Sequence, residues 1–215
     1  MKKIILIRHA ESEGNLGQYF EDSHIIMLSN EGKKQSQELI EILEKPDRIF
    51  VSKFLRTQQT AEPLIRKLQL EKHPHEVHLW FDVHEFEPHD PKGTLGLNQE
   101  DRMNYYLAYW DKLDPNFKYL PGYESFFELM NRILGVLKKL KEIPNGINYV
   151  FTHGIVIKII LFVLNEYPNI ESLKKESSSE FYFEIMKKFR EFNIEFKTKN
   201  AGQYDVTELV EKYGK

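Results

Sequence analysis

The chain has 215 residues, of which 41% are hydrophobic and 29% charged, and its formal net charge is −3 at pH 7. This composition is typical of a globular protein with a sizeable core, and the small net charge argues against nucleic acid or an anionic membrane as a partner. Because the sequence contains no cysteine, disulfides, cysteine-ligated metals and thiolate nucleophiles are excluded. The apolar run before Arg8 is too short for a signal-peptide core, and the run at 155–164 contains Lys158 and is too short to span a membrane. We therefore expect a cytoplasmic protein.

Short apolar segments alternate with helical patterns along the chain. The predicted strands are residues 3–7, 47–52, 76–81 and 148–152. Three of them are almost continuously apolar, as in a parallel sheet covered on both faces. The predicted helices, with apolar residues at helical spacing, are 31–45, 53–70, 124–141, 154–164 and 178–191. Pro63 is expected to kink the second helix or delay its start, and residues 193–207 are expected to form late strands. The alternation predicts an α/β fold with three layers, a mainly parallel open sheet with helices on both faces.

One segment, residues 83–122, interrupts this alternation. It is rich in Pro, Gly and Asp and holds a single short helical pattern at 99–111. Long insertions of this kind frequently cover active sites. We therefore expect a single domain over residues 1–215, with a lid-like insertion at about 83–122.

Basic and imidazole groups follow three of the predicted strands. Arg8 and His9 end the first strand, Arg56 lies just past the second, and His153 follows the strand at 148–152. Glu85 comes a few residues after the strand at 76–81. Because ligands in open α/β sheets bind beyond the carboxyl ends of the strands, we expect these side chains to converge on one site.

A phosphate is the ligand that this mixture of groups fits best. Arginine guanidinium groups bind phosphate oxygens bidentately and stay charged, and Asn15 and backbone N–H groups after His153 can add neutral donors. A neutral imidazole can attack phosphorus, and a carboxylic acid can protonate the departing oxygen. Two arginines and a second histidine supply positive charge, so this chemistry needs no metal ion.

Several segments, in chain order, resemble the sequence blocks of the histidine phosphatase superfamily, the phosphoglycerate-mutase-like group. The first is LIRHAESEGN, which is similar to the family signature of Arg-His-Gly followed by Glu-Thr/Ser and an Asn. Others are LSNEGKKQSQELIEIL, VSKFLRTQQTAEPL and VFTHGIVIKIIL, and VHEFEPHD with YLPGYESFFELMNRI resembles the acid motif and helix start of one branch. The resemblance runs over about residues 3–205, and an ordered match of this length is more specific than any single motif.

The resemblance implies a role for each site residue. It makes His9 the phosphorylated nucleophile and Glu85 the proton donor. It makes Arg8, Arg56, His153 and Asn15 the phosphate-binding residues. Glu87 lies two residues from Glu85, so either carboxyl group could face the site. Ala10 stands where the family usually has glycine, and a positive φ at this position would be strained.

Each of these residues also has a structural interpretation without a function. Asn15 could merely shape its turn, and Arg56 could be an ordinary salt-bridge donor. Five other histidines, some of them in the run HPHEVH, could indicate a metal site; they are His73, His75, His78, His84 and His89. The segment DVH resembles the opening of metal-dependent phosphoesterases, but the GDxxD and GNH motifs of that class do not occur. We therefore expect surface histidines, no metal site and no cofactor.

The resulting hypothesis is a metal-independent, histidine acid phosphatase-like enzyme that hydrolyses small phosphomonoesters through a phosphohistidine. A mutase with the same intermediate is the alternative, but Gly14 stands where glycolytic mutases have Trp. A third possibility is a catalytically idle module that binds a phospho-ligand or a protein, although such a module has no need of His9. The sequence does not specify the physiological substrate or the oligomeric state.

Overall fold

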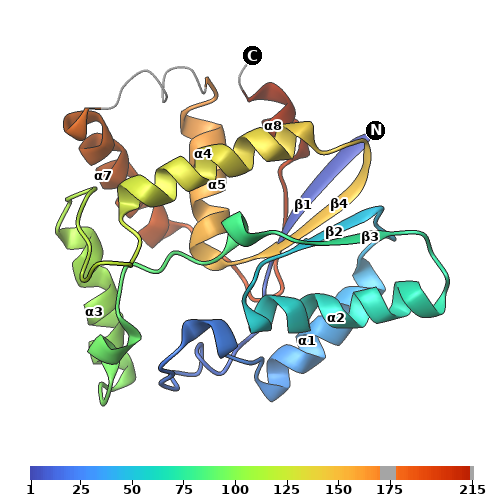
Figure 1. Cartoon of the computed structure of the whole chain (residues 1–215), viewed down its shortest axis with the longest axis horizontal. Helices are drawn as coiled ribbons and strands as arrows, with labels where there is room; N and C mark the ends of the chain where they lie inside the picture. Colours follow the sequence, from blue (N-terminus) through green and yellow to red (C-terminus); the bar gives the residue numbers. More distant parts are fainter. Residues whose placement is uncertain (170–177, 214–215) are drawn as a thin grey trace.

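The computed structural model describes residues 1–169 and 178–213, and its strands form one five-stranded sheet (Figure 1). The strands are β1 (Lys2–Arg8), β2 (Arg48–Val51), β3 (Glu76–Leu79), β4 (Gly146–Thr152) and β5 (Gln203–Asp205). They lie in the order β3-β2-β4-β1-β5, with β5 antiparallel to β1 and the other neighbours parallel. The mainly parallel open sheet expected from the sequence is confirmed.

Helices cover both faces of this sheet because successive side chains of an apolar strand point to opposite sides. In β1, Ile4 and Leu6 belong to one buried cluster, and Ile5 and Ile7 belong to the other. The α-helices are α1 (Asn30–Ile42), α2 (Leu55–Leu70), α3 (Gln99–Asp111), α4 (Phe126–Glu142), α5 (Gly154–Glu166), α7 (Ser179–Glu195) and α8 (Thr207–Lys212). Short 3-10 helices are η1 (Ser23–Ile25), η2 (Phe81–Val83) and η3 (Pro91–Thr94). α1 and α2 lie on one face, and α4, α5 and α8 on the other, which confirms the three-layer architecture (Figure 1).

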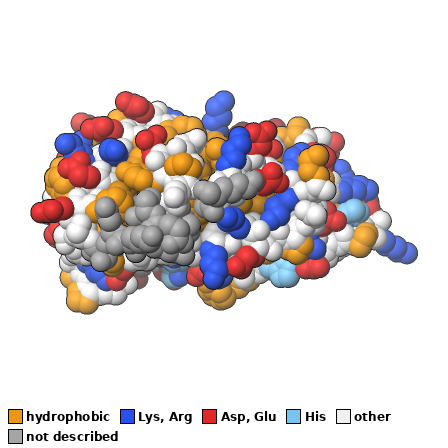
Figure 2. Space-filling view, turned by 90° about the horizontal axis from the view of Figure 1, so that it is seen from above, with side chains coloured by type: hydrophobic (Ala, Val, Ile, Leu, Met, Phe, Trp, Pro, Cys, Tyr) orange, Lys and Arg blue, Asp and Glu red, His pale blue; other side chains and the backbone are white. Residues whose placement is uncertain are grey.

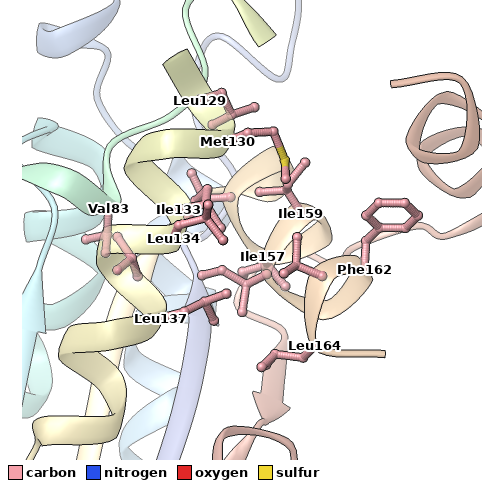
Figure 3. Packing of buried hydrophobic residues seen from close by; sticks show 14 of the residues in the cluster. Val83, Leu129, Met130, Ile133, Leu134, Leu137, Ile157, Ile159, Phe162 and Leu164 are labelled. Atoms are coloured by element: carbon pink, nitrogen blue, oxygen red, sulfur yellow. The ribbon is translucent and has the colours of Figure 1, made fainter. Parts of the chain in front are cut away.

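The larger buried cluster packs α4 and α5 against the sheet. α4 begins with a capping box, in which the Ser125 hydroxyl accepts from the Glu128 N–H and the Glu128 carboxylate accepts from the Ser125 N–H. Apolar side chains of α4 then meet those of α5, as Figure 3 shows for Ile133 and Ile157. Each fully buried aliphatic side chain contributes about 1.5–3 kcal/mol. The cluster therefore fixes the position of α5, whose first residue is Gly154.

Pro63 was expected to kink the helix or delay its start; the late start is wrong, and the kink stays a prediction. α2 runs from Leu55 to Leu70 with Pro63 in its interior. Ala61, Leu64 and Leu68 are buried in the smaller cluster, between α2, α1 and the sheet. This packing outweighs the single backbone hydrogen bond that proline removes.

The C-terminal prediction is only partly correct. α7 continues to Glu195, and within 193–207 the structure has one short strand, β5. The apolar face of α7, where Ile185 and Phe189 are buried, continues to Phe192, which packs partly buried against the same cluster and lies beyond the predicted end at residue 191.

The segment 83–122 leaves the three layers and forms α3 and its flanking turns. α3 lies near the end of the molecule at which β1 and β4 finish (Figure 1). Its aromatic residues enclose His89, whose ring centroid lies 5.0 Å from Tyr105, 5.5 Å from Tyr109 and 4.9 Å from Tyr119. The lid function of this segment stays a prediction.

The surface carries charges of both signs. On the face seen in Figure 2, Lys and Arg side chains are interspersed with Asp and Glu side chains. Among the residues that the structure describes, no helix has the length and apolar character needed to cross a membrane.

Gly32, at the start of α1, provides a test of how this helix is packed. A Cβ atom at this position would lie 1.9 Å from the carbonyl oxygen of Glu11, so the backbone would have to move. We expect Gly32→Ala to lower the free energy of unfolding by about 1–3 kcal/mol in urea denaturation. Gly135→Ala is the matched helical control, because its Cβ would meet no atom of the described residues within 4 Å outside its own helix backbone. It should be neutral or stabilising by up to about 1 kcal/mol; an equal loss in both variants would contradict this packing.

Candidate active site

The register of β1 and β4 brings two histidines together. Arg8 pairs with Thr152 in these parallel strands, so His9 and His153 leave the sheet side by side. The His9 N–H continues the ladder by donating to the Thr152 carbonyl oxygen at 2.9 Å. The two imidazole centroids are 5.3 Å apart. A predicted juxtaposition of residues 144 positions apart in the sequence is thus present in the fold.

His9 is held as a neutral ring with one free nitrogen. It is only 4% exposed, and its Nδ1 lies 2.7 Å from the Ala10 carbonyl oxygen. Because a carbonyl can only accept, Nδ1 carries the hydrogen and Nε2 keeps its lone pair. Burial, followed by the charges of Arg56 and Arg8, holds the pKa of His9 well below its usual value. This is the protonation state that a nitrogen nucleophile needs.

Arg8 and Arg56 supply positive charge beside this ring. The Arg8 Nη1 donates to the Thr198 carbonyl at 2.8 Å, while its Nε is buried without a partner among the described residues. Arg56 is 6% exposed and donates from Nη1 to the Ser23 carbonyl at 2.8 Å. Burial lowers the pKa of both side chains, but that of Arg56 only to about 10, and Glu85 opposes the shift in both. Arg56 is therefore a cation at neutral pH.

His153 lies behind the cavity surface as a second neutral imidazole. It is fully buried, and its Nε2 lies 2.9 Å from the Ser52 hydroxyl oxygen. Burial and the Arg56 charge hold the pKa of His153 well below its usual value. If the Ser52 hydroxyl donates to Nε2, the hydrogen of the ring sits on Nδ1, which is buried and has no partner among the described residues. In that arrangement His153 is a neutral donor, whereas the sequence argument expected positive charge from it.

Glu85 and Glu87 both line the cavity but have different surroundings. The Glu85 Oε1 accepts from the backbone N–H groups of Phe86 at 3.0 Å and Ile155 at 3.2 Å, at the start of α5. Glu87 is engaged by the Ser23 hydroxyl and lies 3.2 Å from the His24 Nε2. The geometry therefore favours Glu85 as the carboxyl group that acts at the site.

Two residues of the loop after His9, Ala10 and Asn15, were also considered in the sequence analysis. The Asn15 Oδ1 accepts from both the N–H and the hydroxyl of Ser12 at 3.0 Å, so Asn15 does shape its turn, and its Nδ2 remains the group that can donate into the cavity. Ala10 is fully buried, and its N–H donates to the Thr60 hydroxyl at 3.0 Å. Ala10 is not among the described residues with positive φ, so the strain considered for a non-glycine residue does not arise.

A cavity of about 340 Å³ joins these groups to the 83–122 segment. Its lining residues include His9, Arg8, Arg56, Asn15 and Glu85. The other lining residues include Tyr19, His89, Thr94, Arg102 and Tyr106. The sequence argument gave no role to Ser52 or Arg102: Ser52 lies inside a quoted family block, whereas nothing in the sequence around Arg102 indicates a site.

The other histidines do not gather into a metal site. Within the described residues, no group of three or more His, Asp or Glu side chains is placed to hold a metal ion. His78 pairs with Glu76 on the exposed edge strand, and His89 lies among tyrosines of the lid segment. His84 is half-buried rather than a surface residue, and its Nδ1 lies 2.8 Å from the Glu85 carbonyl oxygen.

Fold and site together define an α/β protein in which two buried imidazoles and two arginines meet where parallel strands end. The family model of the histidine phosphatase superfamily (branch 1) matches residues 4–177, and the chain belongs to this family. The Bacillus subtilis (strain 168) protein named uncharacterized phosphatase PhoE is 27% identical over 164 residues, which are 75% of this chain and 76% of that protein.

Solved structures share the fold across nearly the whole chain. The phosphoserine phosphatase of Entamoeba histolytica, in complex with 3-phosphoglyceric acid, has a TM-score of 0.66 and 22% identity, covering 95% of this chain and 90% of that one. The alpha-ribazole phosphatase of Shigella flexneri has a TM-score of 0.66 and 20% identity, covering 94% and 89%. At these identities the structural matches establish the fold alone.

The lowered pKa values predict how the two imidazoles titrate. As the pH falls through the ordinary histidine value of 6.5, His9 and His153 should both remain neutral. The unfolded chain takes up these protons at about 6.5, whereas the folded chain does not. The free energy of unfolding should therefore keep its full value above that pH and decrease as the pH falls below it. Long-range ¹H–¹⁵N NMR of the imidazoles measures this directly, and Arg56→Met should raise the pKa of His9. A doubly protonated His9 ring at pH 6.5 would contradict the assignment.

Proposed function

We propose that this protein is a phosphatase that hydrolyses phosphomonoesters through a phosphohistidine on His9, without a metal ion. The observation that carries the proposal is the environment of His9: a neutral ring with Nδ1 bound to the Ala10 carbonyl and Nε2 free, beside the two cationic side chains Arg8 and Arg56. The family and the phosphatase names of its relatives support the same reaction class.

The phosphate binds where buried donors lack partners. The Arg8 Nε and the His153 Nδ1 are both buried without a partner among the described residues, and an unsatisfied buried donor costs about 1–3 kcal/mol. Phosphate oxygens satisfy both donors, while the Arg56 guanidinium and the Asn15 amide donate from the other sides. The charge of the transferred group is then balanced by two arginines, which is the role that metal ions play in other phosphatases.

In the first step, the His9 Nε2 attacks phosphorus as the ester P–O bond breaks. The Glu85 carboxylic acid gives its proton to the departing oxygen, and the alcohol leaves. In the second step, the Glu85 carboxylate takes a proton from water as that water attacks phosphorus. The P–N bond breaks, inorganic phosphate leaves, and His9 returns to its neutral form. The Ile155 and Phe86 N–H groups hold Glu85 in place for both proton transfers.

The 83–122 segment acts as the lid of a single domain in this proposal. It contributes Glu85 at one end and the residues around α3 at the other, and both parts line the same cavity. By closing over the phosphoryl group it limits which alcohols fit and excludes bulk water from the first step.

The proposal is tested by turnover of p-nitrophenyl phosphate. Wild-type protein should release nitrophenol with and without EDTA, and His9→Ala should lower kcat by at least about a thousandfold because the nucleophile is removed. Loss of activity with EDTA, or His9→Ala turnover equal to wild type, would contradict the proposal. Addition of a second alcohol that becomes phosphorylated in place of water would indicate the mutase instead.

Two glutamate variants serve as matched controls in the same assay. Glu85→Gln should lower kcat by about 10²–10⁴-fold because the proton donor is lost. Glu87→Gln removes the same charge two residues away, where it holds Ser23 and His24, and should cost much less. The reverse order would assign the proton donor to Glu87.

A further inference from the structure

We infer that Arg132, paired with Glu124, is a positioning residue for the reaction: it holds the backbone that carries Glu85 and so places the carboxyl group that protonates the departing oxygen. This inference rests on the proposed function, from which it takes the role of Glu85. Arg132 and Glu124 both lie in the segment YLPGYESFFELMNRI, and the proposed reaction steps use neither of them.

The ion pair between Arg132 and Glu124 is largely shielded from water. The side chain of Arg132, on α4, is 11% exposed, and that of Glu124, just before this helix, is 13% exposed. The guanidinium donates from Nε to Oε1 and from Nη2 to Oε2 of the carboxylate, each at 2.7 Å. A bidentate pair of this kind fixes the orientation of the guanidinium plane. It therefore also fixes where the remaining nitrogen, Nη1, can donate.

Three successive backbone carbonyls, those of Asp82, Val83 and His84, directly precede the proposed proton donor. The Arg132 Nη1 donates to the first of them at 2.7 Å and to the third at 2.9 Å. The Thr152 hydroxyl, at the end of β4, donates to the second at 2.6 Å. The chain at this point is therefore tied to α4 and to β4 at once.

The Glu85 carboxylate is held separately, by backbone N–H groups. Its Oε1 accepts from Phe86 at 3.0 Å and from Ile155, at the start of α5, at 3.2 Å. A general acid must lie within hydrogen-bond reach of the oxygen that it protonates, and a displacement of about 1 Å can lower a rate by about 100-fold. A shift of the backbone before Glu85 would move its carboxyl group out of that reach.

The contacts of Arg132 require an arginine rather than a positive charge alone. A buried ion pair is a weak source of stability, because the loss of hydration offsets much of the attraction between the charges. The guanidinium has five N–H groups in a rigid plane, and here they serve one carboxylate and two carbonyls together. A lysine has the same charge on a single nitrogen, which cannot make all four contacts. Arg132→Lys is therefore the variant that separates position from charge.

The test uses two aryl phosphates that differ in their need for a proton donor. Dinitrophenolate leaves as an anion, whereas the leaving group of phenyl phosphate departs readily only when it is protonated. Glu85→Gln should lower kcat/KM for phenyl phosphate by about 10²–10⁴-fold, and for 2,4-dinitrophenyl phosphate by less than about tenfold. Arg132→Lys should show the same selectivity, with losses of about 10–100-fold and less than about threefold, because it misplaces the same acid.

Arg48→Lys is the matched control. The Arg48 guanidinium also lies between a backbone carbonyl, that of Asn145 at 3.1 Å, and a carboxylate, that of Glu76 at 3.7 Å. Arg48 is the first residue of β2, whereas the site lies beyond the other ends of the strands. This substitution should leave kcat/KM unchanged for both esters. Glu124→Gln, which removes the bidentate partner, should reproduce the selective loss of Arg132→Lys in part.

The outcomes distinguish this inference from the proposed function. Equal losses for the two esters in Arg132→Lys, or no loss, in a protein with wild-type melting temperature would overturn the inference. If Glu85→Gln shows no selectivity, or neither ester is turned over, the proposed function fails, and ¹H–¹⁵N NMR of the Ile155 amide tests the positioning alone. That resonance should move in Arg132→Lys toward its position in Glu85→Gln and stay in place in Arg48→Lys. An unmoved Ile155 resonance in Arg132→Lys would overturn the inference.

Discussion

The exclusion of water from a cluster of arginines and imidazoles at the end of β1 and β4 is the constraint on which the rest of the site depends. Burial alone disfavours a charge on either histidine. The two arginines keep their charge because their intrinsic pKa is so high that even the lowered value of Arg56, about 10, lies far above neutral pH. Under the same desolvation, Arg8 and Arg56 remain cations, whereas the rings of His9 and His153 are neutral. A neutral imidazole and two cationic side chains lie next to each other as a result of one physical cause.

This arrangement costs stability, and the fold offsets the cost elsewhere. Like charges at Arg8 and Arg56 repel each other, and the buried Arg8 Nε and His153 Nδ1 have no hydrogen-bond partner in the part of the chain that the structure describes. The offsetting terms are the apolar clusters on the two faces of the sheet, above all the packing of α4 on α5 (Figure 3). An anion that binds only the folded protein adds to its stability by mass action. In the proposed function, a bound phosphate group therefore recovers part of this cost.

The sequence predicted the fold class and the convergence of the site because both follow from local patterns. Apolar strands with continuous runs indicated a sheet covered on both faces, and the rule that ligands bind beyond parallel strand ends joined His9 to His153. The errors have physical causes as well. Tertiary packing keeps Pro63 inside a continuous α2, and Phe192 continues the apolar stripe of α7 past the predicted end at residue 191. The place of Arg102 on the cavity wall could not be predicted, because the sequence around it has no pattern that distinguishes a cavity-lining arginine from a solvated one.

Whether the neutral His9 ring acts on phosphorus is tested most directly by isolating the phosphorylated protein. Wild-type protein mixed with a ³²P-labelled phosphomonoester and quenched in alkali within a fraction of a turnover should carry label that resists alkali and is released by acid. Peptide mapping by mass spectrometry should place the phosphoryl group on His9. Label on a serine, a carboxylate or another histidine, or rapid turnover with no labelled protein in the burst phase, would contradict the account.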